Sequence, residues 1–197
     1  PGLLYFLFVL GMQTAFSSAL DQAAVHVNFT LDLGEFRHLW IGSDLTYIDA
    51  TVTPTMTEAM NQAWKAGFRY MRFHDPIVDA GVYSEDEDGN PQYNWTNFDR
   101  YINAIVSRGY WPVVVLETMP PEIAGYDGGQ GYTNPYPPKD PDGYPKWQNL
   151  VYELVKHCKD TWGGQIRNWY FEVWNEPDAS GYFKGTLEDY LKIYDYA

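Results

Sequence analysis

The chain has 197 residues, of which 45% are hydrophobic and 18% are aromatic. This length allows one domain, and the apolar content is enough to form a core, so global disorder is excluded. Asp and Glu number 26 against 13 Lys and Arg, a net charge of -13, which argues against nucleic acids and anionic membranes as partners. The single cysteine, Cys158, excludes an intrachain disulfide and a thiolate zinc site.

Residues 1–19 are predicted to be a signal peptide whose basic beginning is missing. An apolar run interrupted only by Gly11 resembles the h-region of a signal, and it is shorter than the roughly 20 residues that a transmembrane helix needs. Small residues follow, so we expect cleavage after Ala19; a buried core strand or helix is the alternative. Asn-x-Thr sequons at Asn28 and Asn94 agree with a secreted or lysosomal protein.

After the leader, two kinds of segment alternate along the chain. Short apolar runs that end at Gly, Pro or polar residues are typical of strands, and apolar residues at every third or fourth position are typical of helices. The sequence predicts strands at 38–41, 68–73, 111–116 and 169–174. It predicts helices at 54–65, 98–106, 147–162 and 187–196. Residues 120–144 form a loop rich in Gly, Pro and Tyr, long enough to be functional.

Four strand-helix units in a row favour parallel strands joined by right-handed crossovers. Such units form either a doubly wound sheet or a closed (β/α)8 TIM barrel. The doubly wound sheet is the weaker alternative because no Gly-x-Gly-x-x-Gly follows the first strand. Four units are half a barrel, and a half barrel would leave strand edges open. We therefore predict that residues 20–197 are the N-terminal half of a TIM barrel in a longer α/β protein.

The segment Glu172–Asp178 is the richest in chemical groups. It lies at the carboxyl end of the last predicted strand, where the loops of a barrel form the active face. Strand alternation would put Glu172, Trp174 and Glu176 on one side, so two carboxylates would share an aromatic surround. Burial and like charge would then favour a protonated carboxyl, which glycoside hydrolysis needs as its general acid. The alternative is a set of ordinary polar residues near a strand end, with Trp174 in the core.

The segment Trp169–Asp178 resembles the fourth-strand motif of the retaining barrel glycosidases. The specific resemblance is to glycoside hydrolase family thirty-nine, which contains β-xylosidases and α-L-iduronidases. It covers nearly the whole chain from about His26 onward. The other matching segments are Val25–Asn28, Gly67–His74, Tyr93–Trp95 with Phe98–Asp99, Met119–Pro120, and Tyr190 with Tyr194–Asp195.

The resemblance implies roles for individual residues. Glu176 would be the general acid/base, Asn175 would bind the hydroxyl next to the anomeric carbon, and His74 would contact substrate. We predict Trp174 and Asp178 as further substrate-binding residues. The family's nucleophile, a Glu on the seventh strand, is not in this sequence, so the chain alone is expected to be inactive.

Other residues near these positions support or depart from the family pattern. Arg72, two residues before His74, is expected to point the same way and to pair with Glu172. Val115 stands where the family often has Glu, while Glu117 faces the same side two residues later. The sequence Ile41-Gly42-Ser43-Asp44 departs from the family's pattern after the first strand. The tyrosines of the loop are candidates for sugar stacking, and the alternative is that they are solvent-exposed loop residues without a role in binding. They are Tyr126, Tyr132, Tyr136 and Tyr144.

The predicted function is retaining hydrolysis of xylosides or iduronides, with a carbohydrate as the partner and no cofactor. The four histidines show no spacing typical of metal ligands. Two alternatives remain open. One is a carbohydrate-binding protein that kept the barrel and lost the chemistry, and the other is a different barrel glycosidase, such as an endo-glucanase or a mannanase.

Overall fold

The computed structural model describes residues 42–45, 54–124, 135–139 and 141–197. The chain divides into two units, 1–37 and 38–197, and every described residue belongs to the second. Three predictions lie outside the described residues: the signal peptide, the sequon at Asn28 and the strand at 38–41. They stay predictions.

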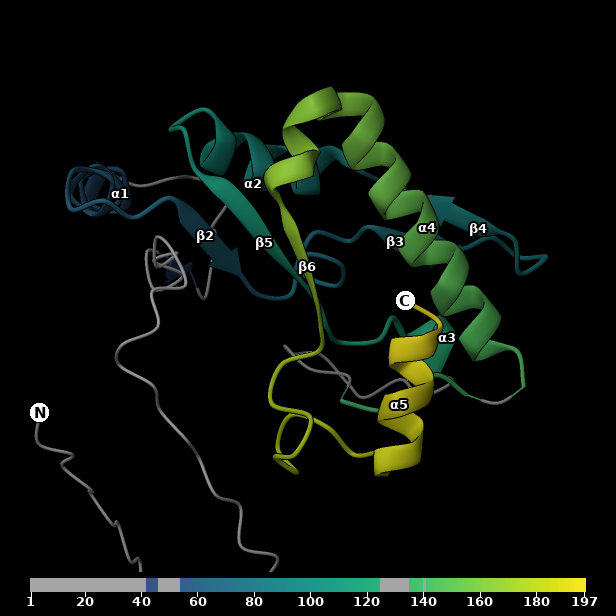
Figure 1. Cartoon of the computed structure of the whole chain (residues 1–197). Helices are drawn as coiled ribbons and strands as arrows, with labels where there is room; N and C mark the ends of the chain where they lie inside the picture. Colours follow the sequence, from purple (N-terminus) through teal and green to yellow (C-terminus); the bar gives the residue numbers. More distant parts are fainter. Residues whose placement is uncertain (1–41, 46–53, 125–134, 140) are drawn as a thin grey trace, which may run out of the picture. The chain divides into compact units, whose positions relative to one another are not determined.

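Four parallel strands form the main sheet, in the order β1-β2-β5-β6. They are β1 (Gly42–Leu45), β2 (Tyr70–Phe73), β5 (Trp111–Leu116) and β6 (Tyr170–Val173). Figure 1 shows β2, β5 and β6 running side by side. All carboxyl ends therefore meet at one edge of the sheet, as expected for consecutive units of a (β/α)8 barrel.

A strand occupies Gly42–Leu45, directly after the predicted strand at 38–41. Gly42, Ser43 and Asp44 were expected to follow that strand, and instead they are themselves part of a strand. They pair in parallel register with β2, so that Gly42 lies opposite Tyr70 and Leu45 opposite Phe73. Backbone pairing with a neighbour, which no local pattern encodes, decides where this strand runs.

Helices follow the strands along the chain. They are α1 (Pro54–Lys65), α2 (Thr96–Val106), α3 (Pro121–Ala124), α4 (Gly143–Trp162) and α5 (Leu187–Asp195), and a 3-10 helix spans Gly163–Asn168. The bounds predicted for α1 are confirmed. The long loop ends earlier than predicted because α4 begins at Gly143, where a Cβ atom would lie 2.6 Å from the carbonyl oxygen of Ile123. None of the helices in the described ranges is long and apolar enough to cross a membrane.

A two-stranded antiparallel hairpin lies between β2 and α2, and the sequence analysis missed it. Its strands are β3 (Tyr83–Glu85) and β4 (Pro91–Tyr93). The carboxylate of Asp86 closes the turn by accepting hydrogen bonds from the backbone N–H groups of Asp88 and Asn90 at 3.0 and 2.8 Å. Each strand has only three residues, too few to show a two-residue period.

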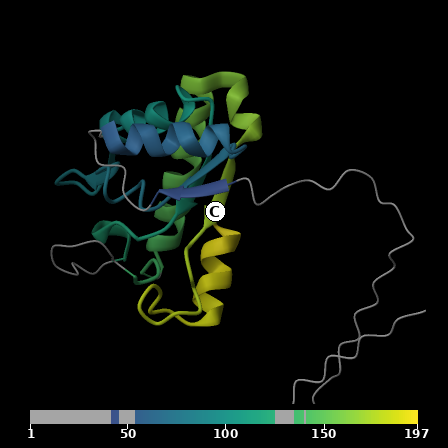
Figure 2. The same cartoon turned by 90° about the vertical axis from the view of Figure 1, so that its left-hand side faces the viewer.

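The two faces of the sheet differ in burial. One face contributes Met71, Phe73, Val114 and Leu116 to the hydrophobic core, where they join Phe98, Ile102 and Ile105 of α2 and Leu150 and Leu154 of α4. The other face begins with three aromatic rings, Tyr70 against Trp111 at 5.2 Å and against Tyr170 at 5.4 Å between centroids. Figure 2 shows α1 toward the viewer, with the sheet behind it.

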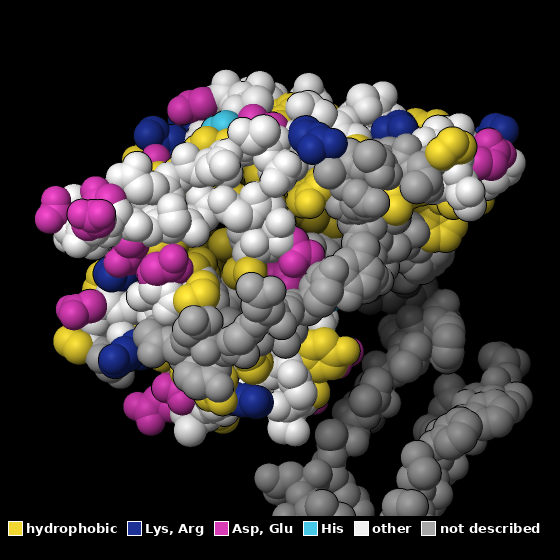
Figure 3. Space-filling view, turned by 180° about the vertical axis from the view of Figure 1, so that it is seen from behind, with side chains coloured by type: hydrophobic (Ala, Val, Ile, Leu, Met, Phe, Trp, Pro, Cys, Tyr) yellow, Lys and Arg dark blue, Asp and Glu magenta, His cyan; other side chains and the backbone are white. Residues whose placement is uncertain are grey.

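On one face of the molecule, charged side chains of both signs lie in several places (Figure 3). On the face seen in Figure 3, Asp and Glu side chains occupy several separate places, with Lys and Arg side chains between them. That face therefore carries no single acidic patch, although the net charge is -13.

Candidate active site

Residues one or two positions beyond β2, β5 and β6 come together at the carboxyl edge of the sheet. His74 follows β2, Glu117 follows β5, and Asn175 lies just beyond β6. Phe73 pairs with Val114, and Leu116 pairs with Val173, so the ends of β5 and β6 are level. This edge is where a barrel enzyme places its chemistry.

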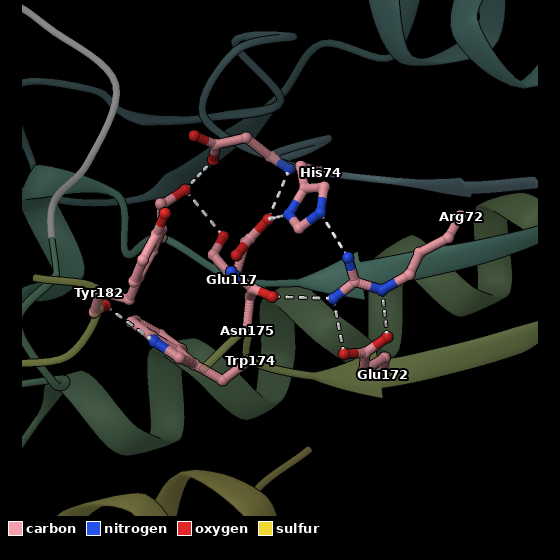
Figure 4. Close-up of polar contacts among 9 residues, drawn as sticks. Arg72, His74, Glu117, Glu172, Trp174, Asn175 and Tyr182 are labelled. Carbon is pink, nitrogen blue, oxygen red and sulfur yellow. Dashed lines mark hydrogen bonds and ion pairs between the residues drawn. The ribbon is translucent and has the colours of Figure 1, made fainter. Parts of the chain in front are cut away.

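Arg72 lies at the centre of this edge and pairs with Glu172, as the sequence predicted. Its Nε and Nη2 atoms donate to the two carboxylate oxygens of Glu172, each over 2.7 Å. The side chains are 23% and 38% exposed, respectively, so water screens the pair only in part. The same Nη2 also donates to Oδ1 of Asn175 over 3.0 Å, and Nη1 contacts Nε2 of His74 (Figure 4). Arg72 thereby ties together residues from β2 and β6.

His74 lies between Arg72 and Glu117. Its Nδ1 atom is 2.6 Å from Oε1 of Glu117, and the backbone N–H of Asp75 donates to the same oxygen over 3.1 Å. Burial raises the pKa of Glu117, although the neighbouring His74 opposes that shift. The predicted contact of His74 with substrate remains a prediction, and the described contacts of its ring are with protein groups.

Asp75 and Thr118 form a second polar pair beside Glu117. The Thr118 hydroxyl donates to the Asp75 carboxyl, and both side chains are buried. Burial raises the pKa of Asp75 to about 8, and the nearby charges of Asp79 and Glu117 add to the shift. Among the described residues, the buried polar or charged side chains are Asp75, Glu117 and Thr118. All three lie at the ends of strands, at the same edge as the candidate site.

Within the described ranges, four residues other than glycine have a left-handed backbone, and all four follow strands of the main sheet. Their φ angles are 54° at Asp75, 53° at Thr118, 66° at Trp174 and 45° at Glu176. This conformation is unfavourable for side chains with a Cβ atom, above all for the branched Thr118. Such residues are concentrated at functional sites, where the surrounding structure holds them in place.

Beyond Val173, the predicted strand alternation is wrong. The strand ends there and Trp174 turns into the left-handed conformation, so Glu176 does not continue the row that contains Glu172. Trp174 is only 2% exposed, packs against Phe183 and donates its indole N–H to the carbonyl of Tyr182 over 3.0 Å. Within the described structure its contacts therefore support the turn.

The carboxylates of Glu172 and Glu176 do not lie together in one buried environment, although the sequence predicted that they would. Glu172 is paired with Arg72, whereas Glu176 is exposed at the edge of the sheet. Asp178 is exposed as well. The turn is held by the backbone, since the N–H of Ala179 donates to the carbonyl of Glu176 over 3.0 Å. The carboxyl group of the predicted acid/base is thus open to a substrate at this edge.

Of the four loop tyrosines considered for sugar stacking, the structure describes Tyr136 and Tyr144, and it rules out Tyr144. Tyr144 is 1% exposed, lies in the first turn of α4, and has the Lys192 ammonium 3.9 Å above its ring, so that ring is not available to a sugar. Tyr136 is partly exposed and has the Lys184 ammonium 5.1 Å from its ring centre. Two further rings, Tyr126 and Tyr132, lie outside the described residues.

Metal binding finds no support in the part of the chain that is described. No group of three or more His, Cys, Asp and Glu side chains there could hold an ion.

The comparisons with known proteins agree on one family. The sequence model of glycosyl hydrolases family 39 matches residues 25–197. A β-xylosidase of Caldicellulosiruptor saccharolyticus is 33% identical over 88% of the chain and 36% of its own length. A β-xylosidase of Geobacillus stearothermophilus is 37% identical over 66% of the chain and 27% of its own length.

A solved structure supports the same relationship. The monomeric β-xylosidase of Caulobacter crescentus CB15 has a TM-score of 0.66 and 29% identity, and the match covers 79% of this chain and 31% of that one. The chain therefore spans about a third of the length of these relatives. Because the family match extends over nearly all of the sequence, the chain belongs to glycosyl hydrolases family 39.

Proposed function

We propose that the complete protein containing this chain is a retaining glycoside hydrolase in which Glu176 is the general acid/base. One observation carries the proposal: Arg72 holds the carboxamide of Asn175 at 3.0 Å, directly beside the exposed Glu176, at the catalytic edge of a parallel sheet. The family match and the β-xylosidase relatives support the same reaction class.

The proposed mechanism has two steps. A second carboxylate, in a part of the protein outside this chain, attacks the anomeric carbon while the carboxyl of Glu176 gives its proton to the departing glycosidic oxygen. A covalent glycosyl-enzyme forms and the alcohol leaves. Glu176, now a carboxylate, then removes a proton from water, and that water displaces the enzyme carboxylate to release the sugar. Asn175 would donate a hydrogen bond to the hydroxyl beside the anomeric carbon.

The proposed substrate is a β-xyloside. The two curated relatives named above are both β-xylosidases, at 33% and 37% identity. An iduronide carries an additional carboxylate, and the net charge of -13 repels anionic polymers at long range. A nitrophenyl xyloside assayed against a fluorogenic iduronide separates the two substrates.

Replacing the acid/base provides the test. In the complete protein, Glu176→Ala is expected to lower kcat for an unactivated xyloside by about 10² to 10⁴-fold, because the leaving oxygen has no proton donor. A xyloside with a good leaving group needs no proton, so it should still form the glycosyl-enzyme. Azide, which needs no general base, should then accelerate turnover and give a xylosyl azide of retained configuration.

A matched control is Glu188→Ala, which removes an exposed carboxylate on α5. It is expected to leave kcat unchanged and azide without effect. Full activity of Glu176→Ala on the unactivated substrate would refute the assignment.

A further inference from the structure

The orientation of the Asn175 carboxamide is determined by its neighbour. Arg72 Nη2 lies 3.0 Å from Oδ1, and because a guanidinium has only donors, the atom that faces it must be the amide oxygen. The Nδ2 group therefore faces away from Arg72, and it donates to no protein atom within the described residues. An amide donor with this fixed direction suits the oxygen of a sugar hydroxyl.

Arg72 is itself held on two sides. The carboxylate of Glu172 receives Nε and Nη2, each over 2.7 Å, which fixes the plane of the guanidinium. On the other side, Nη1 contacts Nε2 of His74. Rotation of the guanidinium that would release Asn175 also has to break the contact with His74.

The protonation of His74 follows from the same donor rule. Since Arg72 can only donate, Nε2 of His74 must accept, and the ring proton is therefore on Nδ1. That N–H donates to Oε1 of Glu117 over 2.6 Å. The carboxylate of Glu117 is held in turn by the backbone N–H of Asp75 at 3.1 Å. Arg72 and Glu117 together thus fix the tautomer and the direction of the ring, and Figure 4 shows the resulting chain of contacts from Glu117 to Asn175.

We propose that Glu117 is a positioning residue for catalysis, which acts through His74 and Arg72 to aim the amide of Asn175 at the substrate hydroxyl beside the anomeric carbon. This inference rests on the proposed function. It assigns a role to a residue at which this chain departs from the family pattern, because a carboxylate stands at 117 while Val115 is fully buried. Glu117 touches no reacting atom and acts only through its neighbours.

The test is a double-mutant cycle in the complete protein, with nitrophenyl xyloside as substrate. Glu117→Ala is expected to lower kcat/KM by on the order of 100-fold, mainly in kcat, because the bond to this hydroxyl strengthens in the transition state. In an Asn175→Ala background the same change is expected to cost less than about 3-fold, since the amide it positions is absent. A role in stability alone would cost the same in both backgrounds.

Two further variants sharpen the cycle. Glu117→Gln keeps an oxygen that accepts from His74, so it should retain activity within about 5-fold of the parent. Glu122→Ala removes an exposed carboxylate five positions further along and should leave kcat/KM unchanged. If Glu117→Ala does not fold, His74→Asn takes its place in the cycle, because it removes the imidazole that joins Glu117 to Arg72.

Equal losses in both backgrounds, or equal losses for Glu117→Ala and Glu117→Gln, would overturn the inference. Such a result would leave the proposed function intact, provided Glu176→Ala remains inactive on the unactivated xyloside. Conversely, an active Glu176→Ala variant would refute the proposed function whatever the cycle shows.

Discussion

The two faces of the main sheet have different tasks, although their residues alternate along the same strands. The face that meets the helices is apolar, with Met71 and Phe73 each 1% exposed. The opposite face carries Arg72 and Glu172, with the row of aromatic rings before them. Stability is therefore expected to depend mainly on the helix side, and catalysis on the other side and on the edge beyond it.

The same strand contributes both to the core and to the polar face of the sheet. Because side chains alternate, a residue on the Arg72 side of a strand is flanked by core residues that hold the backbone in place. Arg72 lies between Met71 and Phe73, and both belong to the core cluster. The packing of Met71 and Phe73 in the core therefore helps to hold Arg72 in position on the opposite face.

The largest expected effect is a loss of stability from a substitution on the face of the sheet that meets the helices. Phe73→Ala should lower the free energy of unfolding by about 3 to 5 kcal/mol, because a fully buried ring is replaced by a cavity. Urea unfolding followed by circular dichroism measures it. Phe73→Leu, which keeps most of the volume, should cost less than about 1.5 kcal/mol. A loss below about 1 kcal/mol for Phe73→Ala would show that this face does not carry the stability.

The next effect concerns the edge and depends on pH. The pKa of Asp75 is raised to about 8, so between pH 4 and pH 8 the native carboxyl keeps a proton that the unfolded chain has lost. The stabilisation from this proton is complete below about pH 4 and is lost as the pH rises toward 8. It amounts to about 1.4 kcal/mol per pH unit, or about 3 kcal/mol between pH 5 and pH 7.

Asp75→Asn should remove this dependence, because the amide does not titrate. In urea unfolding at pH 5, 6 and 7, the free energy of unfolding of the variant should therefore rise relative to that of the parent as the pH rises. Asp160→Asn, at an exposed position on α4, serves as the control and should run parallel to the parent. Parallel curves for Asp75→Asn would contradict the burial of a protonated carboxyl.

The smallest of these effects concerns the ion pair of Arg72 and Glu172, and it tests whether the pair matters for stability, for activity or for both. Arg72→Met leaves the carboxylate of Glu172 without its partner and should cost about 1 to 2 kcal/mol, since both side chains are partly exposed. Arg72→Met with Glu172→Met should recover most of that loss. Both the single and the double variant should have a lowered kcat/KM, because both lack the hydrogen bond from Arg72 to the carboxamide of Asn175.

The control for this pair is Arg167→Met, at an exposed position in the 3-10 helix, which should change stability by less than about 0.5 kcal/mol. A double variant that is no more stable than Arg72→Met would contradict the pairing. Recovery of activity in the double variant would contradict the role given to Arg72.

Much of the fold could be predicted from periodic hydrophobicity. The bounds of α1 and β5 are confirmed, and the parallel order follows from the alternation of strands and helices. The pattern failed where the structure depends on contacts distant in sequence. The strand Gly42–Leu45 pairs with β2, and Gly143 at the start of α4 lies so close to the carbonyl oxygen of Ile123 that a Cβ atom would be 2.6 Å from it.

The candidate site was predictable only in part. The pair between Arg72 and Glu172 followed from strand alternation and is confirmed. The grouping of Asp75 with Thr118 was not visible, because it depends on where β2 and β5 end relative to one another. The position of Glu176 was misjudged for a related reason, since no sequence pattern marks the left-handed turn at Trp174.

The left-handed residues after the strands have a consequence for how the molecule tolerates change. Glycine would occupy any of these positions with less backbone strain, by roughly 1 to 2 kcal/mol each, and yet Asp75, Thr118, Trp174 and Glu176 all carry side chains. The turns after the strands of the main sheet thus keep one shape although a more relaxed backbone is available. Glycine at Asp75, Thr118 or Trp174 would relax the backbone and loosen the turns that aim Glu176, whereas glycine at 176 would remove the carboxyl group itself.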